Sequence, residues 1–145
     1  MRWLRLIAIA WGLSLSGSLL LGAALKWLLN LEPVAVPGTS SATDLIGIAL
    51  VAPLLETLLL WPLLVYFPAR SQFSKVVVAA VLWGALHALE RGPIGLATTF
   101  AFGVYSVVFL RVHNADGPRP AVFVTTIVHS LYNITLVGLA YLLSD

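Results

Sequence analysis

Residues 44–67 read DLIGIALVAPLLETLLLWPLLVYF, a nearly continuous apolar run that begins at the charged residue Asp44. A transmembrane helix needs roughly 20 apolar residues, so this run is long enough to cross a bilayer once. Its interior holds one ionisable residue, Glu56, which lies about 18 Å along a helix from Asp44. The run therefore predicts a membrane-spanning helix with a carboxyl group near the middle of the membrane.

The composition of the whole chain is typical of a membrane protein. Of its 145 residues, 60% are hydrophobic and 10% are charged, and the mean hydropathy is +0.99. A soluble domain has about 25% charged residues, so this chain has too few to cover a water-facing surface. Cysteine is absent, which excludes disulfides, thiolate metal sites and a cysteine nucleophile. The net charge of +2 comes without a basic run, which argues against nucleic-acid binding.

We predict an all-α fold, a polytopic bundle of about five transmembrane helices that forms one integral membrane domain over residues 1–145. Turn-forming and polar residues separate the apolar runs and predict a loop at Pro37–Ser41 and a turn at His113–Pro118. Gly95 and Gly103 in the fourth run predict a close contact between helices. The predicted spans are residues 3–31, 44–67, 75–90, 94–112 and 120–143.

The basic residues predict the orientation of the bundle, because loops rich in Lys and Arg stay on the cytoplasmic side. With five spans, Lys26 and Arg91 fall on one side and the other six basic residues fall on the opposite side. We therefore predict an N-terminus inside the cell and a C-terminus outside. A signal peptide is the alternative for residues 1–24, although the apolar stretch is longer than a signal-peptide core. The six residues on the predicted cytoplasmic side are Arg2, Arg5, Arg70, Lys75, Arg111 and Arg119.

Polar residues inside the predicted spans point to a functional site. A charged side chain at the bilayer centre costs about 2.5–3.5 kcal/mol, so Glu56 has to be neutral, paired or hydrated. His129 and Asn133 are four residues apart and share one helix face. A single buried histidine usually belongs to the packing, but four polar groups at similar depth predict one shared cavity. The four are Glu56, His87, His129 and Asn133.

The order and spacing of these residues resemble the CAAX-protease and bacteriocin-processing (CPBP, or Abi) family of intramembrane proteases. This family includes the eukaryotic Ras-converting CAAX endopeptidase. It carries a Glu-Glu-xxx-Arg motif, a Phe-xxx-His motif and a His-xxx-Asn/Asp motif on separate spans. The matching stretches here are Glu56–Trp61, Trp83–His87 and His129–Asn133, within a family-like core over residues 50–137.

The resemblance implies an endopeptidase that acts within the lipid bilayer on a membrane-anchored or membrane-embedded protein or peptide. It also implies that the chain lies in the cell membrane of a prokaryote, which is the inner membrane where there are two. CAAX-type proteins and precursors with a C-terminal anchor are the substrate classes. In this chemistry Glu56 is the general base that activates water, and His87 helps to hold the water. His129 and Asn133 donate to the oxyanion, and no cofactor is required. Zinc is the alternative cofactor, because Glu56, His87 and His129 together have the donor set of a catalytic zinc site.

Two other functions would use the same polar residues. One is a non-catalytic CPBP-like membrane protein for bacteriocin immunity or scaffolding. In that case Thr57 and Trp61 are signs of a decayed site, because the family has glutamate and arginine at these positions. The other is a haem or ion protein, with His87 and His129 as axial ligands or Glu56 as a proton relay. The protease is favoured, since a decayed site has no reason to keep a costly glutamate among leucines.

Overall fold

The structure is a computed structural model that describes residues 2–31, 42–69 and 71–142, and all regular structure in these residues is helical. The predicted loop at Pro37–Ser41 and the basic residue Arg70 lie outside the described residues. The elements in chain order are α1 Arg2–Leu29, α2 Ala42–Ile46, the π-helical segment η1 Gly47–Val51, α3 Ala52–Tyr66, α4 Gln72–Arg91, the 3₁₀ segment η2 Gly92–Ala97, α5 Thr98–Asp116 and α6 Pro118–Leu142. The all-α prediction is confirmed.

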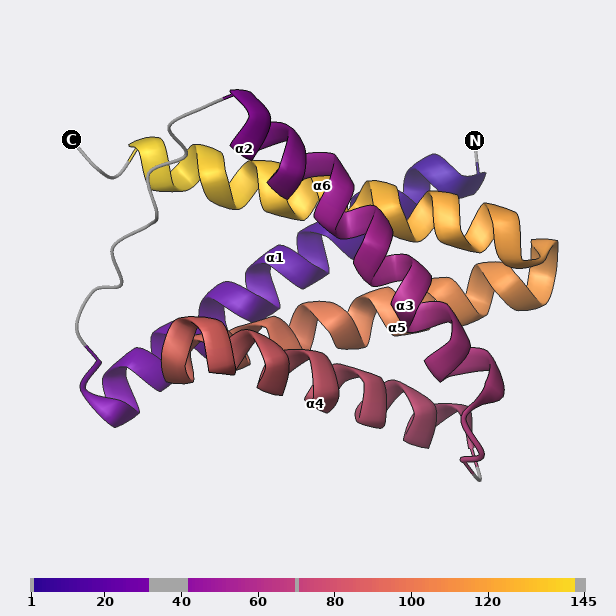
Figure 1. Cartoon of the computed structure of the whole chain (residues 1–145), viewed down its shortest axis with the longest axis horizontal. Coiled ribbons are helices and arrows are strands. Elements are labelled where there is room, and N and C mark those ends of the chain that lie inside the picture. The colour runs from indigo at the N-terminus through magenta and orange to yellow at the C-terminus, as the bar shows by residue number, and fades with distance from the viewer. Residues whose placement is uncertain (1, 32–41, 70, 143–145) are drawn as a thin grey trace.

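Four helical stretches of the described residues are long and apolar enough to cross a membrane. They are Arg2–Leu29, Thr43–Tyr66, Gln72–Asp116 and Pro118–Leu142. The third stretch, 45 residues long, contains α4 and α5, which fold back on each other at η2 and pack side by side (Figure 1). The chain thus follows the predicted course of about five spans. Large apolar side chains such as that of Leu20 face outward, which fits contact with lipid tails.

The helix α5 begins later in the chain than the predicted fourth span, because the turn after α4 is longer than expected. Gly92 ends α4 with φ +69°, a left-handed conformation that favours glycine. Pro93 follows, and the chain makes a 3₁₀ turn before α5 begins at Thr98 rather than at residue 94. The glycine and the proline together therefore displace the helix start by about one turn.

The polar stretch His113–Pro118 is helical for most of its length, so its prediction as a turn is wrong. α5 continues to Asp116 and ends at Gly117, whose φ is +88°. The His113 ring stacks on Phe109 one turn earlier, with centroids 5.8 Å apart. This packing within the last turns of α5 keeps polar residues helical up to the glycine, where the left-handed conformation ends the helix.

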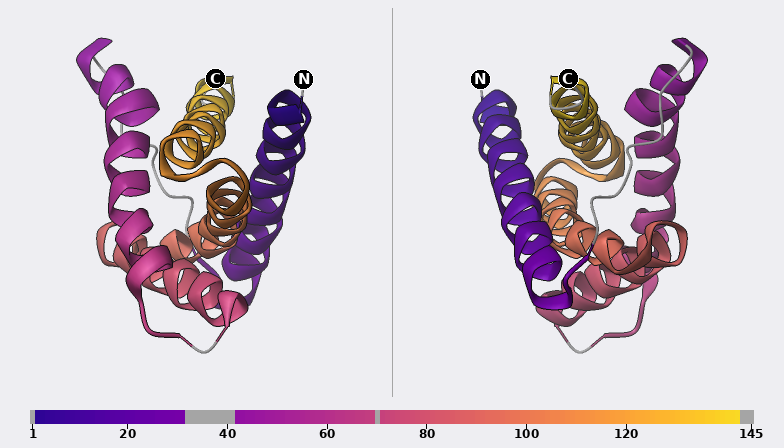
Figure 2. Two further views of the ribbon diagram at one scale, coloured as in Figure 1. Left: turned by 90° about the vertical axis from the view of Figure 1, so that its right-hand side faces the viewer. Right: turned by 90° about the vertical axis from the view of Figure 1, so that its left-hand side faces the viewer.

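α5 is the central helix of the bundle. Figure 2 shows α1 and the α2–α3 run as two arms of a V, with α4 and α5 towards its apex and α6 between the arms. α5 contacts α1, α3, α4 and α6, and more of its residues are buried than in any other described helix. The rings of Phe102, Tyr105 and Phe109 on α5 are fully buried, and the first two contact His129 of α6. The core therefore lies around α5, next to the predicted site on α4 and α6.

Small residues bring α4 and its neighbours close together. A side chain at Gly95 would overlap the carbonyl of His87, so the predicted close contact is confirmed there. At Gly103 the nearest atom to an added Cβ is the Ala80 Cβ at 3.8 Å, an ordinary contact distance. The contact at Gly84, a residue that was not predicted from the sequence, is closer than the contact at Gly103, because a side chain at Gly84 would overlap Thr99. Glycine at these positions lets η2 and α5 pack directly on the helix that carries His87.

The two ends of the bundle carry different charge. Figure 1 places the start of α1 and the α3–α4 and α5–α6 connections together on the right, and the other helix ends on the left. Among the described residues, the right-hand end carries five basic residues and one acid: Arg2, Arg5, Lys75, Arg111, Arg119 and Asp116. The left-hand end carries two of each sign: Lys26, Arg91, Asp44 and Glu90. The fold thus keeps the charge asymmetry on which the predicted orientation depends.

Candidate functional site

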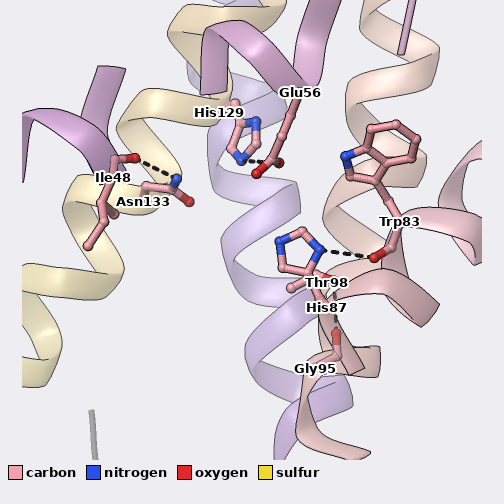
Figure 3. A network of polar contacts seen from close by, with 8 residues as sticks. All are labelled: Ile48, Glu56, Trp83, His87, Gly95, Thr98, His129 and Asn133. Atoms are coloured by element: carbon pink, nitrogen blue, oxygen red, sulfur yellow. Dashed lines mark hydrogen bonds and ion pairs between the residues drawn. The ribbon is translucent and has the colours of Figure 1, made fainter. Parts of the chain in front are cut away.

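Glu56 on α3 and His129 on α6 meet where these two helices pack together (Figure 3). His129 Nε2 lies 3.7 Å from Glu56 Oε2, within ion-pair range but longer than a hydrogen bond. The side chains are 5% and 26% exposed, respectively. Two residues that the sequence assigns to one site are therefore neighbours, although about half of the chain separates them.

Two aromatic side chains of α5 complete the surroundings of His129. Tyr105 stacks on the imidazole, with ring centroids 4.5 Å apart and an interplanar angle of 29°. The Phe102 ring lies 5.4 Å from both His129 and His87. Neither Tyr105 nor Phe102 was predicted from the sequence to belong to the site. Their three-residue spacing, which places them on one face of a helix, is the signal that would have found them.

His87 lies on α4 with its ring centroid 5.4 Å from that of Phe102, and it is half-buried. Its Nδ1 is 2.9 Å from the carbonyl oxygen of Trp83. Because a carbonyl oxygen only accepts, Nδ1 is the donor, and Nε2 of the neutral ring remains an acceptor. Figure 3 shows this second nitrogen on the side of Glu56 and Asn133. His87 is thus oriented by its own helix and presents an acceptor toward the site.

Asn133 contacts the backbone of η1 rather than Glu56 or His129. Its Nδ2 donates to the Ile48 carbonyl at 2.9 Å (Figure 3). In the π-helical segment, the N–H of Ala52 donates to Gly47, so the partner of the Ile48 carbonyl would be residue 53. Residue 53 is proline and has no N–H. Asn133 therefore closes a gap in the backbone hydrogen bonding of α2–α3, and its second N–H remains available.

Three residues differ from the family motifs, and they lie at different distances from the site. Thr57 is buried in the core beside Glu56. Trp83 is buried on α4, and its indole N–H points toward the Glu56 carboxyl group (Figure 3). Trp61 is half-buried on the side of α3 that lines a groove with α6, away from Glu56. Trp83 thus belongs to the site, whereas Trp61 does not.

The ionisable pair keeps hydrogen-bonding capacity. Within the described part of the chain, Glu56 Oε2 and His129 Nδ1 are buried and have no hydrogen-bond partner. A buried polar group without a partner is costly, so these atoms favour binding of a water molecule or a polar group of a ligand. The site therefore pairs a carboxyl group with an imidazole, and each group has one atom that can still form a hydrogen bond to a bound molecule.

The proposed zinc ligands do not form a ligand set. Across residues 2–31, 42–69 and 71–142, no three His, Asp or Glu side chains are close enough together to hold a metal ion. His87 is directed by its bond to Trp83 and is separated from the pair of Glu56 and His129. The donor set of the zinc alternative is thus present in the sequence but is not assembled in this structure.

Comparison with known proteins adds no relative. No family model, no curated protein and no solved structure matches this chain. The resemblance to the CPBP family therefore depends on the three motifs and their order along the spans.

Proposed function

We propose that this chain is an intramembrane endopeptidase of the CPBP type, which hydrolyses a peptide bond of a membrane-anchored or membrane-embedded substrate in a prokaryotic cell membrane. The observation that carries the proposal is the buried contact of Glu56 with His129, 3.7 Å apart on facing apolar helices. A carboxyl group in such a place costs stability, which favours a role in chemistry.

In the proposed reaction, Glu56 accepts a proton from water while the water oxygen bonds to the scissile carbonyl carbon. His87 Nε2 accepts a hydrogen bond from the other O–H of the water and so orients it, and this hydrogen stays on the oxygen. The carbonyl oxygen becomes an oxyanion, which accepts hydrogen bonds from His129 and from the second N–H of Asn133. The C–N bond then breaks, and Glu56 returns its proton to the leaving nitrogen. The products are a carboxylic acid and an amine.

The experiment that tests this function replaces Glu56 by Gln. The amide keeps the shape of the side chain but does not accept the proton, so cleavage should fall by about 10²–10⁴-fold. The measurement compares membranes of cells that express the full chain or the variant, with new C-termini of membrane proteins identified by mass spectrometry. Glu90→Gln, an exposed glutamate on α4, is the matched control and should keep activity.

The melting temperature of the same variant in detergent separates catalysis from structure. A catalytic Glu56 carries a desolvation penalty that the amide lacks, so the stability of Glu56→Gln should stay level or rise. A structural ion pair behaves in the opposite way, because loss of one partner leaves the other buried and destabilises by about 3–5 kcal/mol. Retained cleavage together with such a loss would contradict the proposed function.

A non-catalytic membrane protein of the same fold is the second candidate. The hydrogen bond of Asn133 to Ile48 favours it, because this bond gives one motif residue a structural role. For this candidate, Glu56→Gln leaves the pattern of C-termini in the membrane unchanged. The same experiment therefore distinguishes the two functions.

A further inference from the structure

Two grooves flank the N-terminal half of α6. The groove between α3 and α6 has a volume of about 560 Å³, and the groove between α1 and α6 has a volume of about 410 Å³. Both are lined by Phe123 and Ile127, which therefore form a ridge between them. Arg119 lines the α3–α6 groove and Arg2 lines the α1–α6 groove. Each groove thus combines apolar walls with one arginine at the end that is predicted to be cytoplasmic.

The α3–α6 groove is separate from the candidate active site. Leu54, Leu58 and Trp61 line it at positions i, i+4 and i+7, on one face of α3. Glu56 is two residues from Leu54, a rotation of about 200° around the helix, so it lies on the opposite face. The groove therefore faces away from the carboxyl group of the proposed protease.

The length of the α3–α6 groove matches the hydrocarbon of one bilayer leaflet. Its lining residues on α6 extend from Arg119 to Leu131, about 18 Å along the helix. Half of a bilayer's hydrocarbon core is about 15 Å thick. A hydrocarbon chain that enters beside Arg119 would thus remain within the groove down to the middle of the membrane.

Polar groups are available where a lipid has its headgroup and its esters. Arg119 is exposed and has no ion pair or hydrogen bond within the described residues, whereas Arg2 is paired with Asp116. Trp61 Nε1 is buried, has no partner in the described part of the chain and lines the same groove. Trp61 is five residues before the end of α3 at Tyr66, about 8 Å along the helix. A cation at the surface and an N–H donor below it match a phosphate and the ester carbonyl beneath it.

We propose that the two grooves together bind one anionic diacyl glycerophospholipid of the surrounding bilayer. One acyl chain lies in each groove, on either side of the ridge of Phe123 and Ile127. The phosphate binds Arg119, and an ester carbonyl accepts from Trp61 Nε1. The excess of basic residues at this end of the bundle adds attraction to an anionic leaflet surface. The site does not depend on protease activity, because none of the four candidate catalytic residues lines either groove.

The test titrates the purified full chain in mild detergent with phosphatidylglycerol, phosphatidylcholine or lysophosphatidylglycerol of equal chain length, and counts bound lipids by native mass spectrometry. One phosphatidylglycerol should bind at least about tenfold more tightly than either competitor, because the headgroup contact is charge-assisted and the second chain buries further CH₂ groups. Equal binding of phosphatidylcholine, or equal binding of the single-chain lipid, would overturn the proposal.

Variants locate the lipid. Arg119→Gln should weaken phosphatidylglycerol binding by about tenfold or more and Trp61→Phe by about threefold or more. Leu4→Trp, at an exposed position of the α1–α6 groove, should remove the preference for two chains. The matched controls are Arg111→Gln, an exposed cation at the same end, and Leu20→Trp, an exposed position on α1. Neither control residue lines either groove, so neither variant should change binding.

Three results of the variants would overturn this site. An equal loss of binding in Arg111→Gln and in Arg119→Gln would show diffuse attraction to the surface rather than a site at Arg119. Unchanged binding in both Trp61→Phe and Leu4→Trp would show that the lipid lies elsewhere. A dimer that is lost in Leu4→Trp but unaffected by added lipid would assign the grooves to a second copy of the chain. Circular dichroism of each variant confirms its fold, and Arg119→Lys, which keeps the charge, replaces Arg119→Gln if that variant does not fold.

Discussion

His129 is positioned by an aromatic ring as much as by its acidic partner. The imidazole stacks on Tyr105 at 4.5 Å, closer than any other ring contact among the described residues. Its Nε2 lies 3.7 Å from Glu56. Since a stacked ring has little freedom to rotate, Tyr105 fixes the plane in which His129 presents both nitrogens. The geometry of the site therefore depends on a side chain outside the three motifs.

Replacement of Tyr105 tests this role at the scale of one residue. Tyr105→Phe keeps the stacked ring, so its stability should remain within about 1 kcal/mol of the parent and cleavage should persist. Tyr105→Ala removes the ring and should destabilise by about 3–5 kcal/mol. Thermal melting in detergent and cleavage of membrane proteins are the measurements. If Tyr105→Phe lost as much stability and cleavage as Tyr105→Ala, the hydroxyl group rather than the ring would position His129.

At the scale of elements, η1 and α6 depend on each other. Pro53 leaves the Ile48 carbonyl without a backbone donor, and the π-helical register of Gly47–Val51 gives the N–H of Ala52 to Gly47 instead. The Asn133 amide supplies the missing donor across the contact between η1 and α6. The segment before Glu56 is therefore attached to the helix that carries His129.

A double-mutant cycle between Pro53 and Asn133 measures this attachment. Asn133→Ala should destabilise by about 1–3 kcal/mol, because it leaves a carbonyl without a partner in an apolar environment. In a Pro53→Ala background the new N–H can donate to Ile48, so the same replacement should cost about 1 kcal/mol less. Pro62→Ala, an exposed proline further along α3, is the control and should leave the cost unchanged. Strict additivity of Pro53→Ala and Asn133→Ala in thermal melting would contradict this account.

At the scale of the whole molecule, the fold separates charge along its long axis. The end with the start of α1 and the α5–α6 connection has a large excess of basic residues, whereas the opposite end is balanced. An excess of Lys and Arg marks the cytoplasmic side. The same end carries Arg119 and the two grooves, so orientation and lipid binding are expected on one leaflet.

Cysteine labelling tests the orientation, since the chain has no cysteine of its own. Ser71→Cys before α4 and Glu90→Cys near its other end should react with a membrane-impermeant thiol reagent from opposite sides. Ser71 is expected on the cytoplasmic side. Both residues are exposed, and loss of the Ser71 N-cap, which accepts from the N–H of Ser74 at 3.1 Å, should cost Ser71→Cys about 1 kcal/mol without unfolding α4. Labelling of both from one side would refute the arrangement in which α4 crosses the membrane.

The sequence by itself determined the helical fold, the approximate limits of the spans and the depth of the polar residues. These properties are local, because hydropathy and the cost of burying a charge depend on a residue and its neighbours along the chain. The position of Glu56 in an apolar run needed no knowledge of any other helix. That Glu56 and His129 lie close together was predicted from their similar depth in the membrane. The packing of α3 on α6 decided the distance between them.

Only the tertiary structure decided which helix faces meet. A π-helical turn in η1 changes the register of the helix, so the faces of α2 and α3 do not follow from a single period of 3.6 residues. The bond of Asn133 to Ile48 depends on that register and on the approach of α6. The stack of Tyr105 on His129 likewise depends on how α5 fits between its neighbours. Such contacts join residues far apart in the chain, and side-chain packing selects them.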